Sequence, residues 1–294
     1  MTSAHSLRWR GFVIAGLGVL FLSPDSLLVK ATSVTPVVFL FWRGLLIGLS
    51  FLVINHLRYG RDLPIQMRRC GKRGLYCGVA FAGSTLGFVT GVKYTAAGNV
   101  LVILNTAPVI AALIAWLVWK ERLPLRTWIL ILICVGGASL MAVGEMGGGE
   151  PIGLVMAGVA AFSLASNLAV ARSRPEADMS VMLIIGAVLV AVTAALFGGA
   201  QWPGWRDFGL IVLLCVGFLP VASILIQTGP RYLPAAEVSL FLLLETVLGT
   251  LLVWFFLGEL PGPLGFLGGS IILGSLAVNG VIEDWKERRA LGHP

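Results

Sequence analysis

Charged side chains are scarce in this sequence. They make up 12% of its 294 residues, whereas 57% of the residues are hydrophobic and the mean hydropathy is +0.94. About a quarter of the residues are charged in an average soluble domain. No polar stretch is long enough to fold separately, while apolar runs near the ~20 residues that cross a bilayer recur from end to end. The sequence therefore predicts an integral membrane protein whose main partner is the lipid bilayer.

Groups that bind metals or perform catalysis are also few. The four cysteines show no CxxC spacing and no histidine at ligand distance, and the three histidines fall in tails or loops. These patterns favour neither a metal site, nor a disulfide framework, nor a cofactor. The net charge of +7 does not indicate nucleic acid, because membrane topology explains it, as described below. The first apolar run, residues 11–29, lacks a signal-peptide cleavage site and is expected to be a membrane span.

A long internal repeat dominates what is present. Residues 91–121, GVKYTAAGNVLVILNTAPVIAALIAWLVWKE, return as residues 229–259, GPRYLPAAEVSLFLLLETVLGTLLVWFFLGE, at a constant offset of 138. The offset pairs Tyr94 with Tyr232 and Trp116 with Trp254 without a gap. A fixed long period indicates a duplicated unit. We expect two homologous units, residues 1–143 and 151–294, joined by a glycine-rich connector at 144–150.

Hydropathy predicts an all-α membrane protein with ten spans. They cover about residues 11–29, 36–55, 73–92, 97–119, 127–143, 151–171, 179–197, 207–227, 234–257 and 264–282. Five spans per half is an odd number, so the second half must enter the membrane upside down. This 5+5 inverted-topology repeat around a central cavity is typical of many secondary transporters.

The placement of basic residues supports this topology. With the N-terminus in the cytoplasm, 17 of the 21 lysines and arginines fall on the cytoplasmic side. They are Arg8, Arg10, Arg58, Arg61, Arg68, Arg69, Lys72, Arg73, Lys120, Arg122, Arg126, Arg172, Arg174, Arg231, Lys286, Arg288 and Arg289. Such a bias agrees with the positive-inside rule and places both termini in the cytoplasm.

Small residues punctuate the predicted spans. Gly83, Gly87 and Gly91 are spaced by four in the third span, so one helix face allows a neighbouring backbone to approach closely. Tight packing within one bundle is the favoured interpretation, and a dimer face is the alternative. The sequence does not choose between a monomer and a homodimer.

Three charged residues stand out because they lie deep inside predicted spans. Arg43 lies seven residues after Pro36, about 10 Å into its span, and Glu245 lies eleven residues after Pro234, roughly 16 Å into its span and near the midplane. Asp25 lies at a depth close to that of Arg43. A charge there costs on the order of 2.5–3.5 kcal/mol, so each needs a partner or a wet cavity.

Their roles stay open between structure and function. At the repeat offset Arg43 falls on Val181, Asp25 on Ser163 and Glu245 on Ala107, and charges found in one half alone are hard to explain as shared scaffold. A structural ion pair between Arg43 and a carboxylate is the alternative. A buried carboxyl near the midplane, such as that of Glu245, also suits a carrier of protons as coupling ions. Lys30, just past the first span, either contributes to the site or extends to the headgroups.

Prolines and polar residues suggest a lining for the cavity. Pro24 and Pro108 interrupt the first and fourth spans, and each frees a backbone carbonyl four residues earlier. Asn105 and Ser163 lie at comparable depth and would add polar groups. Candidate apolar walls for a ligand are the aromatic residues Phe21, Phe81, Phe88 and Phe241. Packing or an interfacial belt is the commoner role for such aromatics.

The opening FLSPDSLLVK, followed by FWRGLLIG in the second span, and the repeated segment GVKYTAAGNVLVILNTAPVIAALIAWLVWKERL resemble the EamA branch of the drug/metabolite transporter superfamily. In that branch a lysine ends the first span and an arginine lies within the second, which here are Lys30 and Arg43. Ser23, Pro24 and Asp25 replace the usual Trp-Gly or Trp-Ser motif. The resemblance therefore specifies the fold more closely than the identity of the substrate.

The resemblance implies a multi-pass carrier of the bacterial inner membrane. It would export small-molecule substrates, chiefly amino acids including aromatic ones, by alternating access. A multidrug or toxic-compound efflux carrier of the same fold is the alternative. An enzyme would need a catalytic cluster at one interface, and a channel would need a filter or charged ring; neither pattern is visible.

Overall fold

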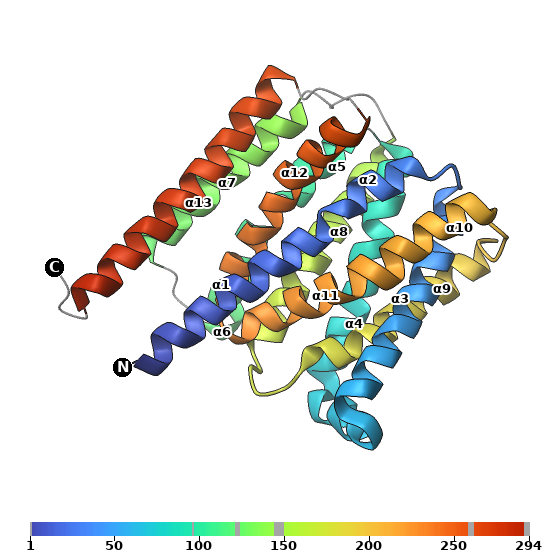
Figure 1. The fold of residues 1–294 in the computed structure, drawn as a ribbon, viewed down its shortest axis with the longest axis horizontal. Helices are drawn as coiled ribbons and strands as arrows, with labels where there is room; N and C mark the ends of the chain where they lie inside the picture. Colours follow the sequence, from blue (N-terminus) through green and yellow to red (C-terminus); the bar gives the residue numbers. More distant parts are fainter. Residues whose placement is uncertain (1, 96, 121–123, 144–149, 258–261, 291–294) are drawn as a thin grey trace.

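The computed structural model describes residues 2–95, 97–120, 124–143, 150–257 and 262–290, and within these ranges it contains helices and no β-strand (Figure 1). The first half contains α1 (Thr2–Leu22), α2 (Pro24–Ala31), α3 (Pro36–Tyr59), η1 (Gly60–Asp62), α4 (Leu63–Tyr94), α5 (Ala97–Leu104), α6 (Ala107–Trp119) and α7 (Leu125–Val143). The second half contains α8 (Pro151–Arg172), η2 (Met179–Met182), α9 (Leu183–Leu196), α10 (Trp205–Val212), η3 (Leu213–Phe218), α11 (Leu219–Thr228), η4 (Gly229–Arg231), α12 (Ala235–Leu257) and α13 (Pro263–Ala290). Most of the connector predicted at 144–150 lies outside the described residues.

Prolines divide two of the predicted spans, as the sequence indicated. The run of residues 11–29 is split between α1 and α2 just before Pro24, and the run of 97–119 is split between α5 and α6 just before Pro108. Proline cannot donate the helical hydrogen bond and its ring crowds the preceding turn, so each helix restarts there.

Two irregularities were not predicted. The eighth predicted span, residues 207–227, comprises α10, the π-helical segment η3 and α11, with Pro220 at the start of α11. The helix α4 begins ten residues before the predicted third span and bends at Gly71, whose φ of 57° favours glycine. Hydropathy does not report either feature, because both depend on backbone geometry rather than on apolar character.

Helices α4 and α8 pack against each other and run in opposite directions. Gly87 approaches α8 so closely that an added Cβ would lie 2.7 Å from the carbonyl oxygen of Met156, and Gly83 faces Ser163. The evenly spaced glycines of α4 therefore pack inside the bundle, which is the favoured interpretation of the sequence.

Helices α3 and α9 also pack side by side and run in opposite directions. Gly44 faces Ala187 and Ala191, and Gly48, one turn later, faces Ala187 and Val188. Residue numbers therefore increase along α3 in the direction in which they decrease along α9. A Cβ on Gly44 would lie 2.5 Å from the backbone nitrogen of Ala191. Small residues thus allow the two backbones to touch where lipid gives no hydrophobic drive for association.

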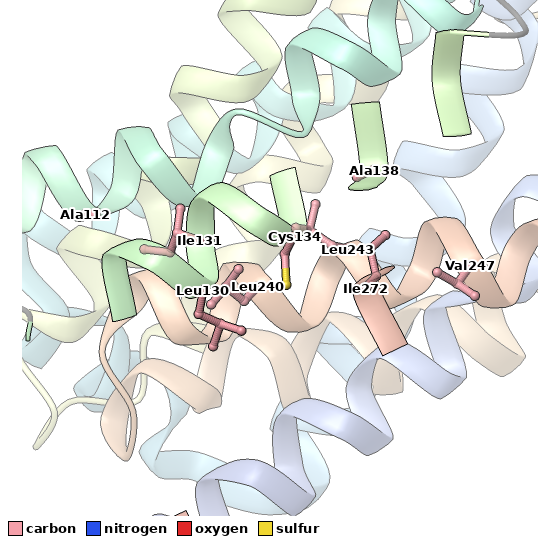
Figure 2. Close-up of a cluster of buried hydrophobic side chains, with 9 residues drawn as sticks. All are labelled: Ala112, Leu130, Ile131, Cys134, Ala138, Leu240, Leu243, Val247 and Ile272. Carbon is pink, nitrogen blue, oxygen red and sulfur yellow. The ribbon is translucent and has the colours of Figure 1, made fainter. Parts of the chain in front are cut away.

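Helices α7 and α13 pair in the same antiparallel manner at one side of the bundle (Figure 1). Sγ of Cys134 on α7 lies 3.5 Å from Oγ of Ser275 on α13, and Gly137 faces Gly268. A cluster of buried side chains joins this pair to α6 and α12 (Figure 2); its members are Ala112, Leu130, Ile131, Cys134, Ala138, Leu240, Leu243, Val247 and Ile272. The cluster fixes which face of α12 is turned toward α7 and α13.

Six stretches of the described chain are long and apolar enough to cross a membrane. They are Trp9–Val29, Pro36–Gly91, Val102–Trp119, Pro151–Arg172, Met179–Leu196 and Trp205–Arg231, and the stretch Pro36–Gly91 includes both α3 and most of α4. Two shorter apolar helices, Leu125–Leu140 and Pro263–Ser275, belong to the α7–α13 pair. The chain is therefore an all-helical membrane protein, and the count of ten spans stays a prediction.

Candidate functional site

The structure joins two of the three intramembrane charges directly. Nη1 of Arg43 lies 2.7 Å from Oδ1 of Asp25, and Nη2 lies 2.9 Å from Oδ2, so the guanidinium donates to both carboxylate oxygens. The two side chains are only 14% and 11% exposed. A bidentate geometry of this kind gives the strongest arginine–carboxylate hydrogen bonds.

The break between α1 and α2 positions Asp25. At the end of α1 the backbone N–H and the hydroxyl of Ser23 both donate to the carbonyl of Val19, at 2.9 and 2.8 Å. Pro24 then starts α2, and Asp25 falls in its first turn, where a helix N-terminus favours a negative charge. The restart of the helix therefore turns the carboxylate toward α3.

One nitrogen of the Arg43 guanidinium has no hydrogen-bond partner. The guanidinium carbon lies 5.8 Å from the centre of the Phe39 ring, one turn earlier on α3, which is within the range of a cation–π contact. The unpartnered nitrogen is Nε, which is buried. A buried unpaired donor costs about 1–3 kcal/mol, so this atom is unusual for a purely structural ion pair.

Glu245 approaches the pair from α12. Leu240, Leu243 and Val247 turn into the buried cluster of Figure 2, and at 100° per residue Glu245 lies on the opposite face of the helix. Helix α12 is in contact with both α1 and α2.

The carboxyl of Glu245 lies within electrostatic range of both Asp25 and Arg43. Within the part of the chain that the structure describes, no group donates a hydrogen bond to it. The site therefore gathers two carboxyl groups and one guanidinium, which we call the charged cluster (Asp25, Arg43 and Glu245). Such a set can bind an ammonium group, bind a carboxylate through arginine, or exchange a proton.

The other predicted residues divide between the surroundings of this cluster and the packing between helices. The ring centre of Phe21, at the end of α1, lies 6.4 Å from that of Phe218 in η3, and the two rings are tilted to each other. Phe241 lies one turn before Glu245, and its ring centre lies 5.6 Å from that of Phe12. Phe81 packs against Phe51 within the core between α3, α4 and α9, with 6.1 Å between the two ring centres.

The remaining predicted residues lie elsewhere in the bundle or at its helix breaks. Asn105, at the break between α5 and α6, is buried, and its side-chain nitrogen has no partner. Ser163 faces Gly83 between α8 and α4, and Phe88 is half-buried on α4. Lys30 belongs to α2, but its side chain lies outside the described set. Pro24 is the first residue of α2, and Pro108 is the second residue of α6.

A second charged group, which sequence reasoning missed, lies at the predicted cytoplasmic end of α3. Asp178 accepts hydrogen bonds from the hydroxyl of Tyr59 at 2.5 Å and from the backbone N–H and hydroxyl of Ser180 at 3.1 and 2.7 Å. Nη2 of Arg58 lies 3.2 Å from Oδ2 of Asp178, the oxygen that also accepts from Tyr59. We call these four residues the end cluster. The available signal was an Asp directly before an apolar run, which is the position typical of a helix N-cap.

These contacts control the charge state of Asp178. Burial by itself would raise the pKa of this carboxyl, but the hydrogen bonds from Ser180 and Tyr59 and the charge of Arg58 together hold its pKa below the usual value of 3.8. Asp178 is therefore ionised at neutral pH, and its oxygens are occupied by neighbours of the same chain.

A third polar contact was also missed. The side-chain amide of Gln227 donates to that of Asn167 at 2.7 Å, between α11 and α8, and both residues are 4% exposed. Amides inside apolar spans join helices in this way. Elsewhere in the described ranges, no three His, Cys, Asp or Glu residues come together to hold a metal ion, and the four cysteines are buried and free.

Comparison with known proteins gives one family. The model of the EamA-like transporter family matches twice, over residues 9–143 and 151–281. An uncharacterized transporter of Bacillus subtilis (strain 168), YwfM, is 28% identical over 219 residues, which cover 69% of this chain and 71% of that protein. A crystal structure matches with a TM-score of 0.75 at 19% identity, over 95% of this chain and 97% of the other. That likeness concerns the fold alone.

Proposed function

The chain belongs to the EamA-like transporter family, and we propose on that premise that it exports small metabolites bearing an amine, above all amino acids including aromatic ones, by alternating access. The charged cluster carries this proposal, because it gathers unequal numbers of acidic and basic groups inside a membrane span. The compartment proposed is the bacterial inner membrane, with both termini in the cytoplasm. No enzymatic step is part of the proposal.

Alternating access in this proposal rests on two inverted units of five spans, residues 1–143 and 151–294. At the repeat offset α3 corresponds to α9 and α7 to α13, and both of these pairs run antiparallel. The contact of α4 with α8 likewise has its counterpart in the contact of α11 with α1. These relations are the ones that a twofold axis in the membrane plane would produce. Rocking of one unit against the other would then open the cluster to each side in turn.

Binding of an amino acid would use all three members of the charged cluster. The ammonium group would meet the carboxylates of Asp25 and Glu245, and the carboxylate would approach the unpaired Nε of Arg43. The apolar side chain would be contacted by Phe21, at the end of α1 four residues before Asp25, and by Phe241, one turn before Glu245 on α12. Asn105, Ser163, Lys30, Phe81 and Phe88 are proposed as more distant parts of the lining.

Proton coupling is proposed to use Glu245. Its carboxyl has no hydrogen-bond donor among the described residues, so a proton or a substrate ammonium can occupy it in turn. Uptake of a proton from outside would then release the substrate, and loss of that proton to the cytoplasm would reset the site.

Efflux from vesicles containing the purified protein tests this function. We expect a panel of amino acids to leave faster in the presence of a pH gradient, with Glu245→Gln abolishing the acceleration. Equal rates of efflux with and without the pH gradient would show that transport is not coupled to protons. Efflux no faster than from vesicles without protein, for every amino acid of the panel, would contradict the export proposal.

A further inference from the structure

A short amphipathic helix lies at the end of the bundle, where α3 turns into α4 (Figure 1). It covers residues 63–70 and ends at the bend of Gly71, whose φ of 57° and ψ of −153° are not helical. Leu63, Met67 and Cys70 follow one another at intervals of four and three residues, and they pack into a buried cluster with residues of α8 and η2. One face of this short helix is therefore fixed to the bundle.

The opposite face of the short helix carries basic side chains. Ile65, Arg68 and Arg69 are spaced by three and four residues, so they share one side of the helix, and all three are exposed. Lys72 follows directly after the bend and is exposed as well. We call Arg68, Arg69 and Lys72 the basic bend.

The charge of this turn is one-sided. Residues 58–73 contain six basic residues and one acidic residue. The α8–α9 connection contributes two carboxylates, but Asp178 is bound by Arg58, and Glu176 lies 3.9 Å from Arg174. Within the described ranges, no hydrogen bond or ion pair engages the side chains of the basic bend. The positive charge of the basic bend is therefore available to an anion from outside the chain.

Exposed apolar side chains lie on the same segments. Leu57, near the end of α3, is 80% exposed, Ile65 is 50% exposed, and Leu75, shortly after the bend, is 49% exposed. Tyr76, one turn beyond Lys72, is also exposed, and tyrosine is enriched at the level of lipid headgroups. Basic residues combined with apolar ones in this way are typical of helices that lie in the interface of a membrane.

We propose that the basic bend binds the phosphate of an anionic phospholipid headgroup in the cytoplasmic leaflet. Clusters of basic residues at the end of a membrane span attract anionic lipids, and arginine holds a phosphate through paired hydrogen bonds. The apolar neighbours favour a lipid over a free anion, because only a lipid places hydrocarbon beside the charge. The inference uses the proposed orientation of the chain and does not depend on what the protein exports.

A bound headgroup would also stabilise the α8–α9 connection. The short helix holds that connection at two points: the carbonyl of Arg69 accepts from Nη1 of Arg174 at 3.2 Å, and Sγ of Cys70 lies 3.4 Å from the carbonyl oxygen of Asp178. Neither contact uses a side chain of the basic bend. A ligand that binds only the folded protein raises its melting temperature, so this temperature should depend on the headgroup.

Retention of phospholipid by the full-length protein tests the inference. The protein is moved from nanodiscs of mixed phosphatidylcholine and phosphatidylglycerol into detergent, and the lipids still bound are counted by native mass spectrometry. Both leaflets of a nanodisc have the same composition, so the result does not depend on orientation. The test variant carries Arg68→Gln, Arg69→Gln and Lys72→Gln. The matched control removes the same charge from the C-terminal basic residues, through Lys286→Gln, Arg288→Gln and Arg289→Gln.

We expect the native protein and the control to retain phosphatidylglycerol in preference to phosphatidylcholine, and the test variant to retain at least about tenfold less phosphatidylglycerol. Phosphatidylglycerol should raise the melting temperature of the native protein and of the control but not that of the test variant. In pure phosphatidylcholine all three should melt together, which shows that the fold is intact. If the test variant melts lower there, the single variant Arg68→Gln, at an exposed position, makes the same comparison.

Three outcomes would overturn the inference. Equal loss of phosphatidylglycerol from the test and control variants would show a general attraction between basic residues and lipid, without a site at the bend. Equal retention by the native protein and the test variant would exclude the basic bend as the binding group. If inorganic phosphate in pure phosphatidylcholine raised the melting temperature as much as phosphatidylglycerol does, the ligand would be a free anion and not a lipid.

Discussion

Two arginine–aspartate pairs in the described chain differ in how fully their groups are satisfied. In the end cluster Asp178 accepts from Tyr59, from Ser180 and from Arg58. In the charged cluster Asp25 accepts from Arg43 alone, and Arg43 retains a buried Nε without a partner. A fully hydrogen-bonded ion pair holds structural elements together. An ion pair with spare donors and an extra carboxyl group nearby can still bind a substrate.

The surroundings of the two pairs sharpen this difference. Cys70 on α4 contributes a further contact to the end cluster, its Sγ lying 3.4 Å from the Asp178 carbonyl. That cluster therefore joins the α8–α9 connection to α3 and α4. The charged cluster lies between helices that also border an open groove, which runs between the break of α1 and α2 and the second half of α12. We therefore expect substitutions in the first to alter stability and substitutions in the second to alter transport.

The largest effect is expected from Arg43→Ala. Removing one partner of a buried ion pair leaves a charge uncompensated and costs roughly 3–5 kcal/mol. We predict loss of measurable efflux together with a lower melting temperature, while the protein still inserts into the membrane. Efflux assays normalised to inserted protein check this, and normal efflux would make Arg43 structural at most.

A smaller and different effect is expected from Asp178→Asn in the end cluster. The amide keeps the size of the side chain but loses the charge that Arg58 and Tyr59 contact, so the free energy of unfolding should fall by about 2 kcal/mol. Thermal unfolding in detergent measures this loss. Efflux per folded molecule should stay within about twofold of the native rate. A loss of efflux without a loss of stability would contradict the claim that the end cluster is structural.

The smallest effect is expected from Tyr59→Phe, which deletes one donor to Asp178 and should cost about 1 kcal/mol at neutral pH. Because the pKa of native Asp178 lies below its ordinary value of 3.8, its ionised form stabilises the fold above that pH. This stabilisation is lost as the pH falls through the lowered pKa.

Without the tyrosine hydroxyl the pKa of Asp178 moves back toward its ordinary value, so the acid-dependent loss of stability should shrink. Unfolding curves recorded on both sides of pH 3.8 check this. An acid-dependent loss as large as that of the native protein would show that the hydroxyl does not stabilise the ionised carboxylate.

The sequence indicated much of this architecture through local signals. Pro24 and Pro108 mark helix breaks because proline acts on its own backbone, and Gly83 to Gly91 mark a close approach because their spacing matches the helix. The similar depths of Asp25 and Arg43 in their predicted spans are compatible with the ion pair that they form.

The remaining features depend on how distant segments meet. Asp178 shows its partners only when α3 is packed against the α8–α9 connection, 119 residues away from Tyr59 in the chain. The groove requires the start of α2 to face the second half of α12, and the free Nε of Arg43 depends on which atoms its neighbours leave uncovered. Hydropathy and spacing carry no information on such contacts.

One measurement tests the central claim most directly, namely efflux by the double variant Asp25→Leu, Arg43→Met. Replacing a buried ion pair by apolar residues of similar size is often neutral or stabilising, so this variant should melt at or above the native temperature. We predict that it transports no amino acid, even under a pH gradient. Native rates of efflux from this stable variant would contradict a role of the charged cluster in transport.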